Sequence, residues 1–182
     1  MNAVRPIETR YKGYRFRSRL EARWAVFFDQ AGIRYDYEPE GFALPSGAAY
    51  LPDFYLPGLG VYVEIKPSLL IPYRGLAKLV EFAHAGGHKL LLIAGSPGQE
   101  AMHLVDRSTC EPLQRAQDGT DDAAEASRAF LASLECWGAV RLCLSPLTRC
   151  WMLQYEAATP HDIVMHERAV SVARGCRFQR SL

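Results

Sequence analysis

The sequence predicts an α/β protein in which helices flank a mixed central sheet, in the order helix, strand, hairpin, helix, strand. Three observations predict this fold class. An apolar stripe at helical spacing follows Ser18, two short apolar stretches flank the turn at residues 57–60, and an unbroken apolar run occupies residues 90–94. Short apolar strands that alternate with helical patterns are typical of a sheet covered by helices.

The first helix is expected to begin at Ser18 and to end at Gly32. Before it, residues 11–16 alternate aromatic and basic side chains around Gly13, which predicts a short strand or arm. Glu21 lies beside the apolar face of this helix. The apolar face consists of Leu20, Trp24, Phe27 or Phe28, and Ala31.

Residues 33–37 predict a strand, whereas residues 39–48 predict a loop because they are rich in Pro, Gly and small side chains. The apolar stretches 50–56 and 61–65 are separated by a turn that contains Pro and Gly, which is the pattern of a β-hairpin. Pro67 prevents the second strand from continuing far, because proline has no amide hydrogen to donate to a sheet.

A second helix is predicted over residues 74–85, which carry apolar side chains at helical spacing and are followed by two glycines. The apolar run 90–94 predicts a strand that is covered on both faces. We expect residues 1–98 to form a core with a basic N-terminal arm, and residues 99–182 an α+β extension packed on it within one structural domain. The predicted elements after residue 98 are a strand over 102–106, an exposed loop over 114–122, a helix over 123–137, strands over 140–144 and 151–155, and a closing helix over 161–177.

The apolar stretches of the chain do not predict a membrane protein. The longest are far too short to cross a bilayer, and the N-terminus lacks the apolar centre of a secretion signal. The five cysteines form an odd set without a CxxC pair, which suits reduced thiols. We therefore expect a protein of the cytoplasm without a membrane partner.

The net charge of +1 conceals an uneven distribution along the chain. Eight basic and three acidic residues within 5–34 give +5, whereas three basic and eight acidic residues within 99–135 give −5. A polyanion is attracted locally to such a basic segment, although a solvated basic face explains the pattern equally well. The side chains that are candidates for phosphate contacts, and equally for plain surface charges, are Arg17, Arg19 and Lys78.

The predicted hairpin brings two acidic residues face to face. If the turn is centred between residues 58 and 59, the numbers of facing residues sum to 117, so that Asp53 faces Glu64. Opposed side chains of an antiparallel pair have Cβ atoms about 5 Å apart, and two carboxylates repel each other there. Either both acids are exposed at a frayed end of the sheet, or a divalent cation lies between them, since Mg²⁺ accepts carboxylate oxygens and waters.

An amine joins the two acids. Side chains alternate along a strand, so Lys66 lies on the face of Glu64 while Ile65 points into the core and offers its backbone carbonyl as a further metal ligand. This set suits phosphodiester hydrolysis: a cation neutralises a phosphate oxygen and activates a bound water, and the lysine positions that water or stabilises developing charge. Ordinary surface charges are the alternative.

Other acidic residues have competing explanations. Ser18 and Glu21 match a capping box, in which the glutamate side chain returns to the Ser18 backbone amide, and spacing alone favours this role over a catalytic one. Glu38 and Glu40 flank Pro39 in a loop and are expected to be solvated rather than catalytic.

These residues together resemble the PD-(D/E)xK nuclease superfamily. Pro52-Asp53 and Glu64-Ile65-Lys66 are similar to its motif, and Glu21 has the position of the glutamate on its first helix. The segments FRSRLEARWA, YLPDFYLP and VEIKP resemble a group of small phage and actinobacterial proteins of that superfamily, and the closing ERAVSVARGCRF is similar to their C-terminal helix.

The resemblance implies a restriction-endonuclease-like core of order α-β-β-β-α-β and cleavage of DNA that depends on Mg²⁺ or Mn²⁺. It implies that Glu21, Asp53, Glu64 and Lys66 are catalytic, with Glu21 reaching the metal directly or through water. It also implies DNA as the partner, bound by a homodimer or within a larger DNA-processing complex. Two alternatives remain: a catalytically silent nucleic-acid-binding or assembly module of the same fold, and a nuclease directed at RNA.

Overall fold

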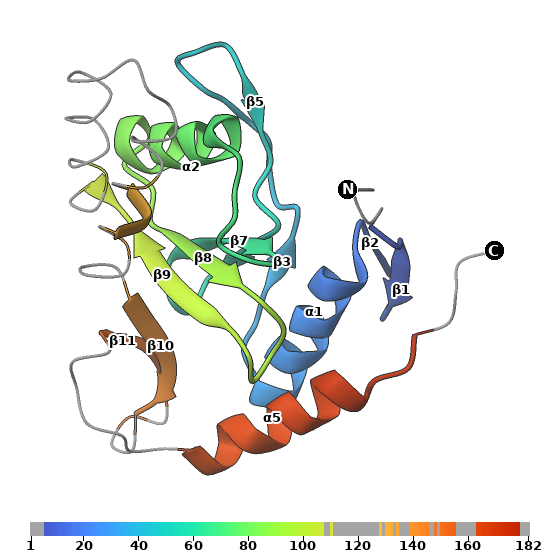
Figure 1. Ribbon diagram of the computed structural model, residues 1–182. Helices are drawn as coiled ribbons and strands as arrows, with labels where there is room; N and C mark the ends of the chain where they lie inside the picture. Colours follow the sequence, from blue (N-terminus) through green and yellow to red (C-terminus); the bar gives the residue numbers. More distant parts are fainter. Residues whose placement is uncertain are drawn as a thin grey trace.

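The computed structural model describes residues 6–107, 110, 128, 130–132, 134, 139–145, 148, 150–155 and 163–178 (Figure 1). The predicted α/β class with a mixed sheet is confirmed. Its helices and strands are β1 (Thr9–Tyr11), β2 (Tyr14–Phe16), α1 (Arg19–Ala31), β3 (Asp36–Tyr37), β4 (Phe42–Ala43), β5 (Ala49–Tyr50), β6 (Phe54–Leu56), β7 (Val61–Lys66), α2 (Tyr73–Ala85), β8 (Leu90–Ala94), β9 (Ala101–Val105), β10 (Ala139–Leu144), β11 (Trp151–Tyr155) and α5 (Ile163–Gly175).

Within the described part of the chain, seven strands form the central sheet in the order β11-β10-β9-β8-β7-β6-β3. Strands β7 and β8 run parallel, and every other neighbouring pair is antiparallel, so the sheet is mixed. Two small hairpins, β1–β2 and β4–β5, lie outside this sheet. None of the helices within the described ranges is long and apolar enough to span a bilayer.

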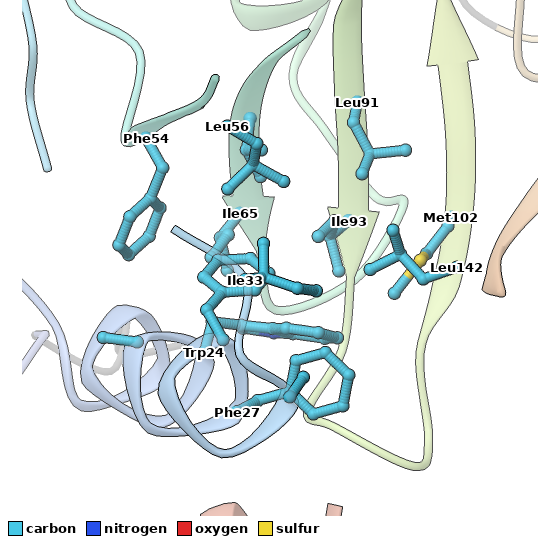
Figure 2. Close-up of a cluster of buried hydrophobic side chains, with 14 of the residues drawn as sticks. Trp24, Phe27, Ile33, Phe54, Leu56, Ile65, Leu91, Ile93, Met102 and Leu142 are labelled. Atoms are coloured by element: carbon cyan, nitrogen blue, oxygen red, sulfur yellow. The ribbon is translucent and has the colours of Figure 1, made fainter. Parts of the chain in front are cut away.

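The central strand β8 is buried along its whole length, as the unbroken apolar run predicts. Leu91 and Ile93 belong to a hydrophobic cluster with α1, whereas Leu90 and Leu92 belong to a second cluster with α2. Successive side chains of a strand point to opposite faces, so the two helices cover opposite faces of the sheet. Figure 2 shows Trp24 of α1 within the first cluster.

Helix α1 has the ends that the sequence predicts. Ser18 caps its N-terminus, where the Ser18 hydroxyl accepts a hydrogen bond of 3.1 Å from the Glu21 amide. Gly32 ends the helix in a left-handed conformation (φ 69°). The reciprocal half of the predicted capping box is wrong, because the Glu21 carboxylate accepts its hydrogen bond from the Arg17 amide instead of the Ser18 amide.

The cap glycine gives a first testable prediction. A Cβ added at Gly32 contacts nothing within 4 Å, so Gly32→Ala costs only the left-handed backbone conformation. We expect the free energy of unfolding to fall by about 1 kcal/mol, measured by urea denaturation. Gly58→Ala is the matched control, because its added Cβ also meets open space and its φ is not positive. If Gly32→Ala and Gly58→Ala lowered the free energy of unfolding equally, the left-handed conformation of Gly32 would not be the cause of the loss.

The hairpin β6–β7 has the predicted register. Leu56 faces Val61 and Phe54 faces Val63, so that each pair sums to 117, and the four-residue turn begins at Pro57. The structure differs from prediction before this hairpin. The strand expected over residues 33–37 is reduced to β3, because the Ile33 amide donates to the Phe28 carbonyl (2.8 Å) and so closes the end of α1.

The segment predicted as a loop over residues 39–48 is also partly wrong. Phe42 and Ala43 form β4 and pair with Tyr50 and Ala49 of β5, so the loop contains one strand of a small hairpin. Its rings pack on α2, with the centroids of Phe42 and Phe82 4.9 Å apart. The Pro and Gly residues of this segment predicted a loop, and strands of only two residues have no sequence pattern of their own.

The C-terminal part joins the same fold. Strands β9, β10 and β11 lie close to their predicted positions and extend the central sheet, and α5 packs along α1 (Figure 1). Ala169 and Ala173 of α5 belong to the hydrophobic cluster that contains Trp24. The exposed loop predicted over residues 114–122 lies outside the described residues, as does most of the helix predicted over 123–137.

Candidate active site

A cleft of about 1160 Å³ lies where the N-terminal end of α1, the β4–β5 hairpin and the N-terminal part of α2 come together. It gathers side chains that are far apart in the sequence. All seven side chains singled out from the sequence line it: Glu21, Asp53, Glu64 and Lys66 as catalytic candidates, and Arg17, Arg19 and Lys78 as candidates for phosphate contacts.

Asp53 immediately precedes β6, at the point where the pairing with β7 ends. Continuing the register by one residue places it opposite Glu64. Its Oδ2 accepts a hydrogen bond of 2.7 Å from the backbone amide of Ile65. The side chain thus takes over an amide of β7 that β6 no longer pairs, and Asp53 is left only 4 % exposed. The Ile65 side chain lies in the core as predicted.

Glu64 lies on the inner part of the cleft and is 6 % exposed. Its Oε2 accepts a hydrogen bond of 2.8 Å from the Tyr50 hydroxyl, and its Oε1 contacts the Lys66 ammonium. Lys66 therefore shares the face of Glu64, as the alternation along the strand predicts. The alternative that Asp53 and Glu64 face each other because both are solvated at a frayed end is wrong, since both are buried.

Glu21 reaches the cleft from the first turn of α1 and is 7 % exposed. Its Oε2 accepts hydrogen bonds from the Tyr37 hydroxyl (2.8 Å) and from the Arg17 amide (3.2 Å). The Tyr37 hydroxyl also accepts from the Arg17 amide (3.0 Å). The buried Glu21 carboxylate thus joins α1 to Tyr37 of β3 and to the residue before the helix cap.

Arg17 binds two acids at once. Its Nη2 lies 2.9 Å from Asp53 Oδ1, and its Nε lies 2.5 Å from Glu38 Oε1. The expectation that Glu38 is simply solvated is therefore wrong, whereas Glu40 is exposed and accepts a hydrogen bond from Tyr62. Glu38 has a positive φ of 46°, an uncommon conformation for a residue other than glycine.

Other basic residues of the cleft and of the N-terminal segment have partners within the chain. Lys78 donates to the Ala49 carbonyl (3.1 Å) at the rim of the cleft. Lys12 pairs with Asp29 (3.1 Å), and Arg15 pairs with Glu8. Part of the positive charge of the N-terminal segment is thus compensated within the chain.

Negative charge is in excess in the group of side chains around Asp53, although Arg19 and Lys78 also line the cleft. Burial raises the pKa of the Asp53 carboxyl well above its usual value, and the Glu64 and Glu21 carboxylates raise it further. In this group two basic side chains, Arg17 and Lys66, stand against the carboxylates of Glu21, Glu38, Asp53 and Glu64, which gives the group a formal charge of 2 − 4 = −2. A divalent cation has the opposite charge, so the donor set suits such an ion.

The arrangement is not a ready-made cage of three ligands. Among the described residues, no three Asp, Glu, His or Cys side chains are grouped so that they could hold a metal ion. Magnesium is commonly held by one or two carboxylates and keeps several waters, so Asp53 and Glu64 are the side chains that could hold such an ion.

Sequence reasoning missed three members of the site. Tyr50 and Tyr37 donate hydrogen bonds to Glu64 and Glu21, and Glu38 pairs with Arg17. In the sequence the two tyrosines are indistinguishable from ordinary aromatic core residues of strands. The one sequence signal that could have pointed to Tyr50 is its position three residues before the acidic residue Asp53.

The Tyr50 hydroxyl gives a second prediction. Tyr50 is 7 % exposed, and Tyr50→Phe leaves Glu64 Oε2 without this donor in a buried site. We expect the free energy of unfolding to fall by about 2 kcal/mol, measured by urea denaturation. Tyr62→Phe is the matched control, because it removes a hydroxyl that donates to the exposed Glu40. A loss in the control as large as that of Tyr50→Phe would count against a special role for the Tyr50–Glu64 bond.

Comparison with known proteins identifies no relative. No protein-family model matches the chain, and no curated protein or solved structure is significantly similar to it. The function must therefore be argued from the cleft itself.

Proposed function

We propose that the protein is a metal-dependent endonuclease that hydrolyses phosphodiester bonds of DNA. One observation carries the proposal: two buried carboxylates, Asp53 and Glu64, lie face to face in a cleft, with the Lys66 ammonium on one of them. Burying like charges is costly unless something compensates them. Binding of a cation, and then of a phosphate group, would compensate the buried charge and so explain why the protein keeps it.

Each residue has a proposed role. Asp53 and Glu64, with the Ile65 backbone carbonyl, hold Mg²⁺ or Mn²⁺, and Glu21 assists directly or through a water. When bound, such a cation neutralises phosphate charge and lowers the pKa of a bound water. Lys66 orients the attacking water or stabilises the charge that develops on the phosphate. The Tyr50 and Tyr37 hydroxyls hold the Glu64 and Glu21 carboxylates in position.

The order of elements is consistent with this proposal. Leaving out the two small hairpins, the elements up to β8 run α1, β3, β6, β7, α2, β8, and this agrees with the α-β-β-β-α-β order that the resemblance implies. Asp53 and Glu64 lie at one end of the β6–β7 hairpin within that order, as in the PD-(D/E)xK motif that the sequence resembles.

Basic side chains at the cleft supply the proposed contacts to the DNA backbone. Arg17, Arg19 and Lys78 line it, and positive groups beside an acidic centre suit a polyanionic strand. We further propose that the enzyme acts in the cytoplasm, as a homodimer or within a larger DNA-processing complex.

The direct test is incubation of the pure protein with supercoiled circular, linear and branched DNA. Each is assayed with Mg²⁺, with Mn²⁺, and with excess EDTA. We expect nicking of the circle in the presence of a metal, because a circle without ends is cut only by an endonuclease. A labelled RNA of the same sequence distinguishes an RNA-directed nuclease. Failure to cut any of these with either metal would overturn the proposal.

A second function is favoured by a separate observation. Arg17 and Lys66 already pair with Asp53 and Glu64, so part of the buried charge is compensated without a metal. A catalytically silent nucleic-acid-binding or assembly module could keep such a site. It is expected to bind DNA equally well with and without EDTA and to leave every substrate intact.

A further inference from the structure

Arg17 lies beside the proposed metal ligand Asp53. We propose that Arg17 is a built-in counter-ion that competes with the divalent cation for Asp53, and that Glu38 retains the arginine when the cation displaces it. The inference rests on the proposed function, because it concerns the same cleft. It adds a determinant of metal affinity that lies outside the metal ligands.

The two oxygens of Asp53 have different partners. Oδ2 accepts the Ile65 amide at 2.7 Å, within the backbone framework of the sheet. Oδ1 lies 2.9 Å from Arg17 Nη2. The Arg17 guanidinium therefore contacts Oδ1, the Asp53 oxygen that has no hydrogen bond to the backbone amide of Ile65. A cation that takes Oδ1 as a ligand must replace Nη2 there.

Glu38 offers the displaced arginine a second anion. Its Oε1 lies 2.5 Å from Arg17 Nε, whereas Asp53 Oδ1 lies 2.9 Å from Nη2 of the same guanidinium. The Glu38 amide donates to the Asp53 carbonyl (2.9 Å), which fixes this glutamate beside the site. The backbone of Glu38 has a positive φ, and such a conformation persists only where the surrounding structure holds it.

The arginine can move without disturbing the fold. Its side chain is 52 % exposed at the cleft, whereas the Asp53 side chain is 6 % exposed. The Arg17 backbone is held separately, because its amide donates to the Tyr37 hydroxyl and the Glu21 carboxylate. Displacing the guanidinium from Asp53 thus removes one ion pair, keeps the ion pair with Glu38 and leaves the backbone at the start of α1 in place.

The experiment measures Mn²⁺ binding by electron paramagnetic resonance of the free ion, in the full chain and without DNA. For Arg17→Met we expect a dissociation constant about tenfold lower than in the wild type, because a unit positive charge beside a ligand has gone. Arg17→Lys keeps the charge and should bind Mn²⁺ nearly as the wild type does. In EDTA, Arg17→Met should also have a lower melting temperature, and added Mn²⁺ should raise that temperature more than in the wild type.

Arg15→Met is the matched control. Arg15 lies two residues earlier and pairs with the exposed Glu8, so this variant removes the same charge outside the cleft and should leave Mn²⁺ binding unchanged. Glu38→Gln tests the second anion. It should weaken Mn²⁺ binding in the wild type and weaken it less in the Arg17→Met background, because the arginine that Glu38 retains is then absent.

The outcomes separate this inference from the proposed function. If the wild type binds Mn²⁺ and cuts DNA but Arg17→Met binds Mn²⁺ equally or more weakly, the competition is refuted and the nuclease stands. If Arg15→Met tightens binding as much as Arg17→Met does, the effect is one of overall charge and the inference also fails. If the wild type neither binds Mn²⁺ nor cuts DNA, the proposed function itself is wrong.

Discussion

Lys66→Ala is expected to lower the rate of DNA cleavage by about a thousandfold, because it removes the amine that acts on the water or on the developing charge. The Lys66 side chain is about one-third exposed, and its ammonium contacts Glu64. The rate of nicking of supercoiled DNA under single-turnover conditions measures the effect. Circular dichroism and the melting temperature establish that the variant is folded.

Lys12→Ala is a suitable control for this variant. Lys12 lies in the turn of the β1–β2 hairpin and pairs with Asp29, so its loss removes a lysine from the same chain but not from the cleft. It should cut DNA at the wild-type rate. A folded Lys66→Ala variant that also cut at the wild-type rate would remove the catalytic role proposed for this lysine.

The largest expected loss of stability follows from Trp24→Ala. Trp24 is fully buried between α1 and the sheet (Figure 2). Its indole Nε1 donates to the Gly95 carbonyl at 3.0 Å. Removing the ring should lower the free energy of unfolding by about 4 kcal/mol. Urea denaturation followed by circular dichroism measures the change.

Two further variants dissect this loss. Trp24→Phe keeps most of the buried surface and deletes the hydrogen bond, so its cost should be well under half that of Trp24→Ala. Met152→Ala truncates a side chain that is 47 % exposed and should change stability little. If Trp24→Ala cost no more than Met152→Ala, the packing of α1 on the sheet would be wrong.

The strongest sequence patterns predicted the fold best. The register of β6 and β7 follows from the position of the turn, and the ends of α1 follow from Ser18 and Gly32. Both are decided by neighbouring residues along the chain. The β4–β5 hairpin escaped prediction because its strands are two residues long, and they are stabilised by packing on α2 more than by their own pattern.

The candidate site was predictable only in part for a related reason. Alternation along β7 placed Lys66 with Glu64, and the hairpin register placed Asp53 opposite them. The pairing of Arg17 with Asp53 joins residues 36 positions apart, and no local pattern specifies it. Two like-charged acids therefore appeared to require a cation, although the chain itself supplies two basic partners that compensate them in part.

The packing of α5 along α1 has a consequence for the order in which the site can be assembled. A ribosome makes α1, with Glu21, early, but it makes α5 only after the whole sheet. Before α5 has been made, the side of α1 that packs against α5 lacks this contact, so the helix that carries Glu21 is incompletely supported. The full arrangement can form only when residues near Gly175 have emerged, so the helix that carries Glu21 gains this support late in synthesis.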